Sequence, residues 1–447
     1  MNKTYDLFTD QDLKQLVIPL LFEQLLLMTV GIVDTVVVSY AGEAAVSGVS
    51  LVNSFNTVLI YLFTALAAGG AVVISQYIGR KSLDRAGEAA SQLLLISAVV
   101  SVILAVLTLL FCRPLLTLLF GNVEGAVMDA CVTYLRISAY SYPAVAVYDA
   151  GAALYRSAGN TSTPMKISVA ANGINVAGNI IGVFVFHAGV AGVAYPSLIS
   201  RAFAAVVITK YCFSGCLTVR YRMKWVFEWN AIMMKRVMGI AVPNGVENGV
   251  HQLVKVALSS LAALFGTYQI AANGVAQSIW SLASIAGLAL GPAFTTVIGQ
   301  CMGSGDAEAA DYYFKKLMKI TLILSGLWNG LIFALTPLLM CFYAISADTK
   351  QLVILMVLIN NIFNGISYPF AGPLGNGLRA AGDVKYTMIV SIVLTVVVRL
   401  AVSTVLSLYL NMGVMGIAWG MGVDLTIRGV MFYRRYRSRK WTAFNVI

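Results

Sequence analysis

The sequence predicts an all-α polytopic membrane protein with twelve transmembrane helices in two pseudo-symmetric six-helix bundles. The first observation behind this is composition: of 447 residues, 59% are hydrophobic and only 11% are charged, whereas a soluble domain carries about 25% charged residues. A soluble fold so poor in charge could not cover its own surface, so the apolar surface must face lipid. The second observation is an internal repeat at half the chain length.

Twelve apolar runs can be placed along the chain. Each is long enough for a membrane helix, which needs about 20 residues, and too long for a barrel strand, which needs about 10. Only helices and closed barrels satisfy every backbone polar group inside lipid. The predicted spans lie near 14–40, 46–75, 89–111, 126–156, 163–186, 190–212, 235–264, 270–299, 315–341, 350–378, 384–409 and 414–435.

Basic residues, which give the chain a net charge of +11, collect in alternate loops. This is the positive-inside pattern, and it predicts a multi-pass protein of the inner (plasma) membrane with both termini cytoplasmic. A nucleic-acid partner is not expected, because no basic face with interleaved aromatic residues appears. The clustered bases are Arg80, Lys81, Arg85, Lys166, Arg220, Arg222, Lys224, Lys235, Arg236, Lys315, Lys316, Lys385, Arg434, Arg435, Arg437, Arg439 and Lys440.

The repeat has a nearly constant offset of 224 residues. Single matches arise by chance, but an ordered series across the whole chain does not. Because six spans per half is an even number, both halves enter the membrane in the same orientation, as in parallel repeats. The matches are Pro19 with Pro243, Glu23 with Glu247, Gly42 with Gly266, Gln76 with Gln300, Gly79 with Gly303, 156–160 with 379–383 at offset 223, and 189–194 with 413–418.

This repeat predicts four parts of the chain. Residues 1–212 form an N-terminal six-helix lobe, 213–234 a cytoplasmic interlobe linker, 235–435 a C-terminal six-helix lobe and 436–447 a basic cytoplasmic tail. Two equivalent lobes suggest a carrier that alternates access by rocking. A static pore remains an alternative.

Motifs of enzymes and metal centres are missing from the sequence. The six cysteines have no paired metal spacing and there are only two histidines. No metalloprotease, nucleotide-binding or serine-hydrolase motif appears. We therefore expect neither an enzyme nor a cofactor, and we expect the chain to work as a monomer.

Several stretches resemble the multidrug and toxic compound extrusion (MATE) family. They are Val33-Asp-Thr-Val with 42–46, Leu-Tyr-Arg-Ser-Ala-Gly-Asn at 154–160, Leu-Arg-Ala-Ala-Gly-Asp within 375–383, and Gly-Val-x-Gly-x-Ala in both halves. The resemblance spans nearly the full length. It implies twelve helices in two lobes, and export of amphipathic, often cationic small molecules in exchange for H+ or Na+.

Asp34 is the strongest candidate for ion coupling. It lies about twenty residues into the first span, and a carboxylate at the centre of a bilayer is costly, at about 2.5–3.5 kcal/mol. Its neighbours at i±4, Val30 and Val38, are apolar, so a partner must come from another span. The fifth span carries Asn172, Asn175 and Asn179 on one helical face.

The resemblance implies which residues surround that carboxylate. A family member places an asparagine, an acidic residue four positions later and a hydroxyl near the first-helix aspartate, which correspond here to Asn175, Asn179 and Ser197. Asn179 departs from the pattern because it is not acidic. Asp34 and Asn175 could ligate Na+, or Asp34 could carry a proton. A purely structural hydrogen-bonded Asp34 is the alternative.

Glu23 and Glu247 occupy equivalent positions, each four residues after a proline. Carbonyls freed by the kink could join a carboxylate in binding a cation. The family often pairs a glutamate at the second position with an acid on the tenth span, but no acid occurs near Tyr368. Glu247 shares a helical face with His251 and Lys255, so either a coupling or substrate role or a structural Glu–Lys pair is expected.

Further polar residues within the spans are candidates for a substrate cleft. Asp149 lies seven residues before Arg156, so it could face substrate or pair locally. Arg399 is expected to partner a carboxylate, and Asn53 and Asn273 either line the cleft or join helices. Because Lys255 and Arg399 are basic, a flippase for lipid-linked or polysaccharide precursors of a related fold remains the alternative function.

Overall fold

The computed structural model describes residues 7–121, 124–215, 217–341, 346–444 and 446–447. Within these ranges every regular element is a helix. Ten helices are long and apolar enough to cross a membrane by length and composition alone. The chain divides into two compact units, Asp10–Gly245 and Val246–Ile447, the second of which also includes the described residues 7–9.

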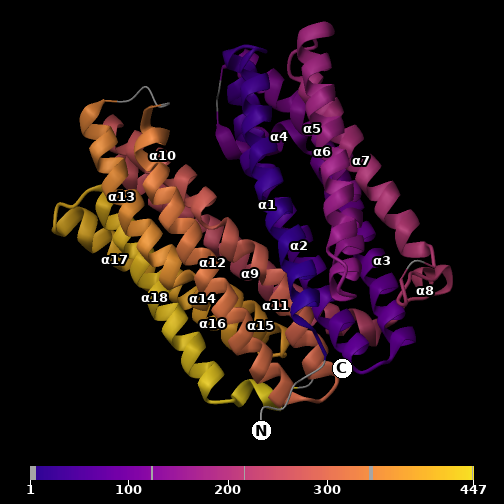
Figure 1. Cartoon of the computed structure of the whole chain (residues 1–447). Coiled ribbons are helices and arrows are strands. Elements are labelled where there is room, and N and C mark those ends of the chain that lie inside the picture. Colours follow the sequence, from indigo (N-terminus) through magenta and orange to yellow (C-terminus); the bar gives the residue numbers. More distant parts are fainter. Residues whose placement is uncertain (1–6, 122–123, 216, 342–345, 445) are drawn as a thin grey trace. The chain divides into compact units, whose positions relative to one another are not determined.

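The described part of the first unit contains six long helices, and each corresponds to one predicted span (Figure 1). Two short helices complete it. The long helices are α1 (Asp10–Ser39), α2 (Glu43–Gly79), α3 (Leu83–Leu110), α5 (Gly125–Ser157), α6 (Ser162–Ile180) with the π-helix η1 (Ile181–Val185), and α7 (Ala191–Phe213); the short ones are α4 (Cys112–Phe120) and α8 (Met223–Phe227).

The helix α9 (Ala231–Ala263) starts in the first unit and continues into the second. The second unit repeats the order of the first with more breaks. Its elements are α10 (Thr267–Ala283), α11 (Ile285–Gly303), α12 (Ala307–Cys341), α13 (Ala347–Ile366), α14 (Tyr368–Ala371), α15 (Pro373–Ala380), α16 (Val384–Val393), η2 (Leu394–Arg399), α17 (Leu400–Thr404), η3 (Val405–Tyr409), α18 (Val414–Arg437) and the 3-10 helix η4 (Lys440–Ala443).

Two predicted spans of the second half are interrupted helices. Span 270–299 is divided at Ser284 into α10 and α11, and span 350–378 into α13, α14 and α15. The second division is explained by Pro369 and Pro373, which lack the N–H that a continuous helix would use. The predicted class, an all-α membrane protein with twelve spans in two bundles, is confirmed.

The internal repeat extends to backbone conformation. The π-helices η1 and η3 begin at Ile181 and Val405, which are 224 residues apart. Gly42 and Gly266 both follow a helix with positive φ, 103° and 91°. A side chain would be strained at such an angle, which explains why glycine occurs at this turn in both halves.

A close contact between η1 and α7 sets the position of the polar face of α6. A Cβ atom on Gly182 would lie 2.1 Å from the carbonyl oxygen of Gly192, so only glycine permits this approach. The equivalent approach in the second unit brings Gly416 on α18 against Ser407 in η3. In the first unit this packing places α6 beside α7, so that the amide groups of α6 lie next to the hydroxyl groups of α7.

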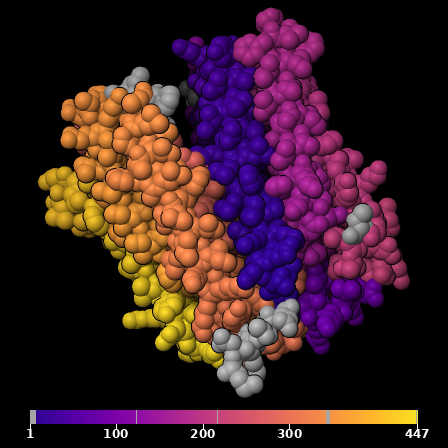
Figure 2. Space-filling view, viewed as in Figure 1, coloured from indigo at the N-terminus to yellow at the C-terminus, as the bar shows by residue number. Residues whose placement is uncertain are grey.

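Helix α1 has a strongly apolar outer surface. Large side chains on it are at least half exposed, as expected for contact with lipid rather than water. The same helix, drawn in indigo, forms a continuous ridge on the viewed face in Figure 2. These exposed residues are Ile18, Phe22, Ile32 and Val36.

Candidate ion and substrate site

A chain of hydrogen bonds connects Asp34 on α1 with α6 and α7. The amide Nδ2 of Asn179 donates to Oδ1 of Asp34 at 2.7 Å and to Oδ1 of Asn175 at 3.2 Å. The Nδ2 of Asn175 donates to the hydroxyl of Ser197 at 2.9 Å, and that hydroxyl donates to the carbonyl of Val193. The structure thus brings together all four residues predicted for ion coupling in this lobe.

One donor of this chain, the Nδ2 group of Asn179, contacts the carboxylate, whereas Asn175 and Ser197 donate away from it. Because Asn179 presents its NH2 group to Asp34, the arrangement suits an ionised carboxylate that accepts hydrogen bonds. The other amide atom of Asn179, Oδ1, is buried and has no hydrogen-bond partner among the residues that the structure describes. A carboxylate beside a free amide oxygen is a donor set that a hard cation prefers.

Asp34 also lines two cavities within the first lobe. One has a volume of about 440 Å³ and is bordered by α1, α2, α5, α6 and α7; the other, of about 420 Å³, is bordered by α1, α2, α5 and α7. Glu23 and Asp149 line the first cavity with Asp34, so three carboxylates face one space. Apolar side chains such as Leu27 and Ile60 form part of its wall, which gives the space the mixed character that an amphipathic cation needs.

Glu23 forms a buried ion pair that links α1 to α5. The Nη2 atom of Arg156 lies 2.8 Å and 2.9 Å from the two carboxylate oxygens of Glu23. The hydroxyl of Tyr148 donates to Glu23 at 3.4 Å and to the carbonyl of Pro164 at 3.1 Å. Arg156 therefore neutralises one of the three carboxylates that face the cavity.

The same pair recurs in the second lobe, on α9 and α15. The Nη2 atom of Arg379 lies 2.7 Å from both oxygens of Glu247. The Glu–Lys pair considered from the sequence is therefore wrong: Glu247 bonds Arg379, while Lys255, two turns further along α9, is exposed. The arginine lies 132 residues away in sequence, so helical spacing could not identify it.

The carboxylate of Asp149 is held by weaker interactions than that of Glu23. Thr64 on α2 donates its hydroxyl to Asp149 Oδ2 at 3.4 Å, and Asp149 borders the 440 Å³ cavity. Arg156, the local partner considered from the sequence, makes its ion pair with Glu23. Asp149 is thus the more available of the two carboxylates for a ligand in this cavity.

At the repeat positions of the first-lobe site, the second lobe carries cationic groups. With an offset of 224, Asn175 corresponds to Arg399, Ser200 to Asp424 and Ala204 to Arg428. The Nη2 atom of Arg428 lies 2.8 Å from both oxygens of Asp424.

Arg399 is buried, and within the described part of the chain its guanidinium makes one contact, 3.5 Å to Nε2 of His251. It has no ion pair among the described residues. The cluster of Arg399, Arg428 and Asp424 therefore has an excess positive charge, whereas the cavity of the first lobe combines the carboxylates of Glu23, Asp34 and Asp149 with Arg156 and Arg201.

The two asparagines predicted to line a cleft differ in their surroundings. Asn53 lines the 420 Å³ cavity and accepts a hydrogen bond from the Tyr134 hydroxyl at 3.2 Å. Asn273 on α10 is buried, and its Oδ1 has no partner among the described residues. Asn53 thus faces an open space, whereas Asn273 lies in the helix packing.

Sequence reasoning missed the arginines of both glutamate pairs as partners. The signal was available, because Glu23 and Arg156 recur together as Glu247 and Arg379 at offsets of 224 and 223. Two residues that recur together in a repeat are candidates for contact.

Comparison with known proteins agrees with the repeat. The MatE family model matches the chain twice, over residues 19–181 and 243–405, which together cover well over half of it. Among curated relatives, "Uncharacterized transporter YisQ" of Bacillus subtilis is 26% identical over 98% of this chain and 95% of its own length. "Probable multidrug resistance protein NorM" of Thermotoga maritima is 24% identical over 96% of this chain and 93% of its own.

Solved structures share the fold. A multidrug resistance MATE family transporter of the MOP superfamily in an outward-facing conformation superposes with a TM-score of 0.87 at 20% identity, covering 96% of this chain and 95% of its own. A MOP superfamily transporter from Pyrococcus furiosus, described as having a binding pocket of reverse polarity, gives 0.88 at 18% identity with the same coverage. With the two family-model matches at the repeat offset, the chain belongs to the MatE family of membrane transporters.

Proposed function

We propose that this protein is a secondary active multidrug exporter of the plasma membrane, which exchanges amphipathic cationic compounds for H+ or Na+. The observation that carries the proposal is the position of Asp34: it faces a 440 Å³ cavity within the first lobe and accepts a 2.7 Å hydrogen bond from Asn179. We further propose that both termini are cytoplasmic and that one chain is the working unit.

Competition for the carboxylate of Asp34 would couple movement of the substrate to movement of the ion. A cationic substrate in the cavity and an incoming ion both favour contact with Asp34, so binding of one weakens binding of the other. A ligand can shift a conformational equilibrium only through its different affinity for the two states. Asp34, Asn175, Asn179 and Ser197 would hold the ion, and Asp149 would contact the substrate. Rocking of the lobes would then expose the site alternately to each side.

The coupling ion remains a choice between two chemistries. Na+ would use oxygen ligands from Asp34 and the asparagine amides, and Asn179 Oδ1 has no hydrogen-bond partner within the described part of the chain. A proton would need Asp34 alone. The role of Glu247 in coupling is less favoured by the geometry, because both of its oxygens contact Arg379.

A second candidate function is supported by the cationic cluster in the other lobe. Two buried arginines against one carboxylate, with His251 beside Arg399, suit a substrate with an anionic group. A flippase for lipid-linked or polysaccharide precursors would use such a cluster, with Lys255 and Arg399 contacting the phosphate.

The test is transport of a fluorescent amphipathic cation in proteoliposomes, with H+ and Na+ gradients imposed separately. We expect one gradient to drive movement in the wild type and neither to drive it in Asp34→Asn. Asp84→Asn is the matched control, because Asp84 is an exposed carboxylate paired with Arg222 at 2.7 Å and should leave transport unchanged. No cation movement under either gradient would favour the flippase, and lipid-linked substrates would be assayed next.

A further inference from the structure

A cavity of about 700 Å³ lies within the second lobe, and its lining does not include Arg399, Asp424 or Arg428. Its walls come from α12, from α14 and α15, and from the C-terminal end of α18 with the residues that follow. Four bases, Lys315, Lys319, Arg437 and Arg439, face one carboxylate, Asp311. The mouth of this cavity therefore has a large excess of positive charge.

The single carboxylate is already engaged. Lys315 lies 2.7 Å and Arg439 lies 3.3 Å from Oδ2 of Asp311. Lys319 and Arg437 have no ion pair among the residues that the structure describes. These two exposed cations are left to attract an external anion.

The rest of the cavity is apolar. On each of the two long helices that line it, the basic residues lie at one end of the lining and the less polar residues at the other. On α12 the bases are followed by Leu322 and Ile323, and on α18 Tyr433 precedes Arg437. From Lys315 to Ile323 the helix rises by roughly 12 Å at 1.5 Å per residue. A ligand with a charged head and an apolar body about this long would match both parts.

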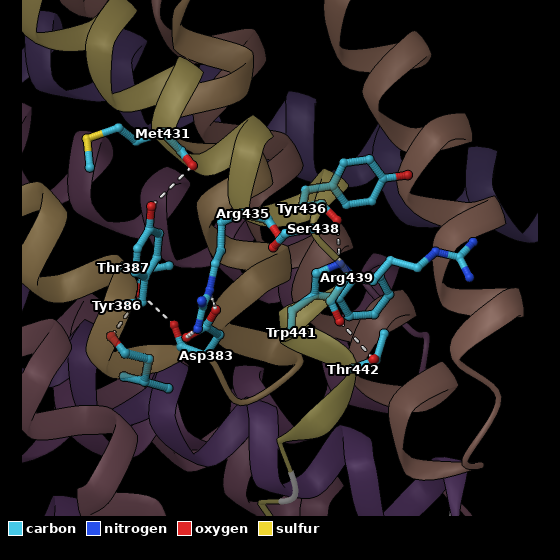
Figure 3. A network of polar contacts seen from close by, with 11 residues as sticks. Asp383, Tyr386, Thr387, Met431, Arg435, Tyr436, Ser438, Arg439, Trp441 and Thr442 are labelled. Carbon is cyan, nitrogen blue, oxygen red and sulfur yellow. Dashed lines mark hydrogen bonds and ion pairs between the residues drawn. The ribbon is translucent and has the colours of Figure 1, made fainter.

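The charged end of the cavity is built on a rigid turn, shown in Figure 3. After α18 the chain folds back, so that Trp441 is completely buried and its Nε1 donates to the carbonyl of Tyr436 at 2.9 Å. The two rings stack with centroids 6.2 Å apart. Arg435 is held by Asp383 at 2.6 Å, so it is not part of the free charge.

We propose that this cavity binds one anionic phospholipid. The phosphate contacts Lys319 and Arg437, and an acyl chain lies against Leu322, Ile323 and Phe370. The site lies at the end of the lobe that carries the basic tail, which charge distribution assigns to the cytoplasmic leaflet, where anionic lipids attract basic residues.

A free phosphate would fill only the charged part. The apolar wall contributes to binding only when methylene groups leave water to contact it, and each buried CH2 group adds to the affinity. The proposal therefore commits to a lipid, and the soluble anion is a result that the test can detect.

The experiment measures binding of short-chain phosphatidylglycerol, phosphatidylcholine and inorganic phosphate to the purified full chain by native mass spectrometry and by thermal unfolding in detergent. The first variant is Lys319→Gln with Arg437→Gln. The matched control is Arg434→Gln with Lys440→Gln, two exposed bases of the same region that do not line the cavity and remove the same charge.

We expect phosphatidylglycerol to bind and stabilise the wild type and the control pair, but to bind the Lys319/Arg437 variant roughly 30-fold more weakly, because each cation contributes about fivefold. Ile323→Gln should weaken phosphatidylglycerol binding while leaving the response to salt unchanged. Equal losses in both double variants would overturn the proposal in favour of general charge attraction. Stabilisation by inorganic phosphate equal to that by phosphatidylglycerol would overturn it in favour of a soluble anion.

Discussion

Arg156 on α5 and Glu23 on α1 form an ion pair whose carboxylate is buried, and Arg379 and Glu247 form the equivalent, partly buried pair in the second lobe. In both lobes the pair joins the lobe's first helix to the segment that contains the Arg-x-Ala-Gly motif. The duplication thus preserved a contact as well as the residues that make it.

Removing the arginine of the first pair should be strongly destabilising. In Arg156→Leu the carboxylate of Glu23 stays buried without its partner, and loss of one member of a buried pair costs about 3–5 kcal/mol. Thermal unfolding in detergent checks this. Arg85→Gln is the control, because the Arg85–Glu88 pair is exposed at the arginine end and is worth about 0–1 kcal/mol. Similar unfolding midpoints for the two variants would contradict a large contribution of the Glu23 pair to stability.

Asn179 and Asn172 lie on the same helix but should differ in their effect on coupling. Asn179 donates to Asp34 at 2.7 Å, whereas the amide of Asn172 donates to Ser168, at 3.4 Å. A hydrogen bond to a charged group contributes about 1.5–3 kcal/mol, so Asn179→Ala should reduce gradient-driven transport by about tenfold or more. Asn172→Ala should change substrate affinity with coupling retained, because Asn172 lines the 440 Å³ cavity. Equal loss of coupling in both variants would remove Asn179 from the ion site.

Substitutions of Arg399 and of Arg428 should have different effects on the stability of the protein. Arg428→Leu leaves Asp424, which is fully buried, without its ion pair, and should destabilise by about 3–5 kcal/mol. Arg399→Leu removes a buried cation that has no ion pair among the described residues, so the unfolding midpoint should be unchanged or higher. Thermal unfolding beside a transport assay distinguishes the two. A large loss of stability in Arg399→Leu would show that this arginine is a packing element.

Two tryptophans provide a test of the C-terminal turn. Trp441 is completely buried and packs against Phe314, with ring centroids 5.1 Å apart, while Trp229 is 70% exposed. Trp441→Ala should destabilise by about 3–5 kcal/mol, as expected for deletion of a large buried side chain. Trp229→Ala should leave the unfolding midpoint nearly unchanged. Equal shifts would mean that the turn after α18 does not contribute to the stability of this lobe.

Much of the fold could be predicted because lipid imposes strict conditions on a chain. Long apolar runs must be helical, and an offset of 224 residues must reflect two copies of one unit. The breaks near Ser284 and Gly372 could not be located from apolarity, since the interrupted runs remain apolar throughout. Their positions follow from local backbone chemistry, such as Pro373 at the start of α15.

The sequence predicts which residues make up the candidate site, but it does not predict which of them contact one another. Helical spacing indicated that Asn175 and Asn179 share a face, but which of them contacts Asp34 depends on how α1 lies against α6. That register depends on the packing of the two helices against each other, which helical spacing within one span does not specify. The same limit explains Glu247, whose partner Arg379 comes from a distant segment rather than from its own helix.

The contrast between Asn175 and Arg399 implies a division of labour after duplication. Both copies kept the Glu–Arg pair that holds a bundle together, but only one retained an acidic aspartate on its first helix, since Leu258 occupies the position equivalent to Asp34. An ancestor with two identical halves would have treated both alike. The present chain therefore combines two copies of one fold whose intramembrane charges differ, with Asp34 in one half and Arg399 in the other.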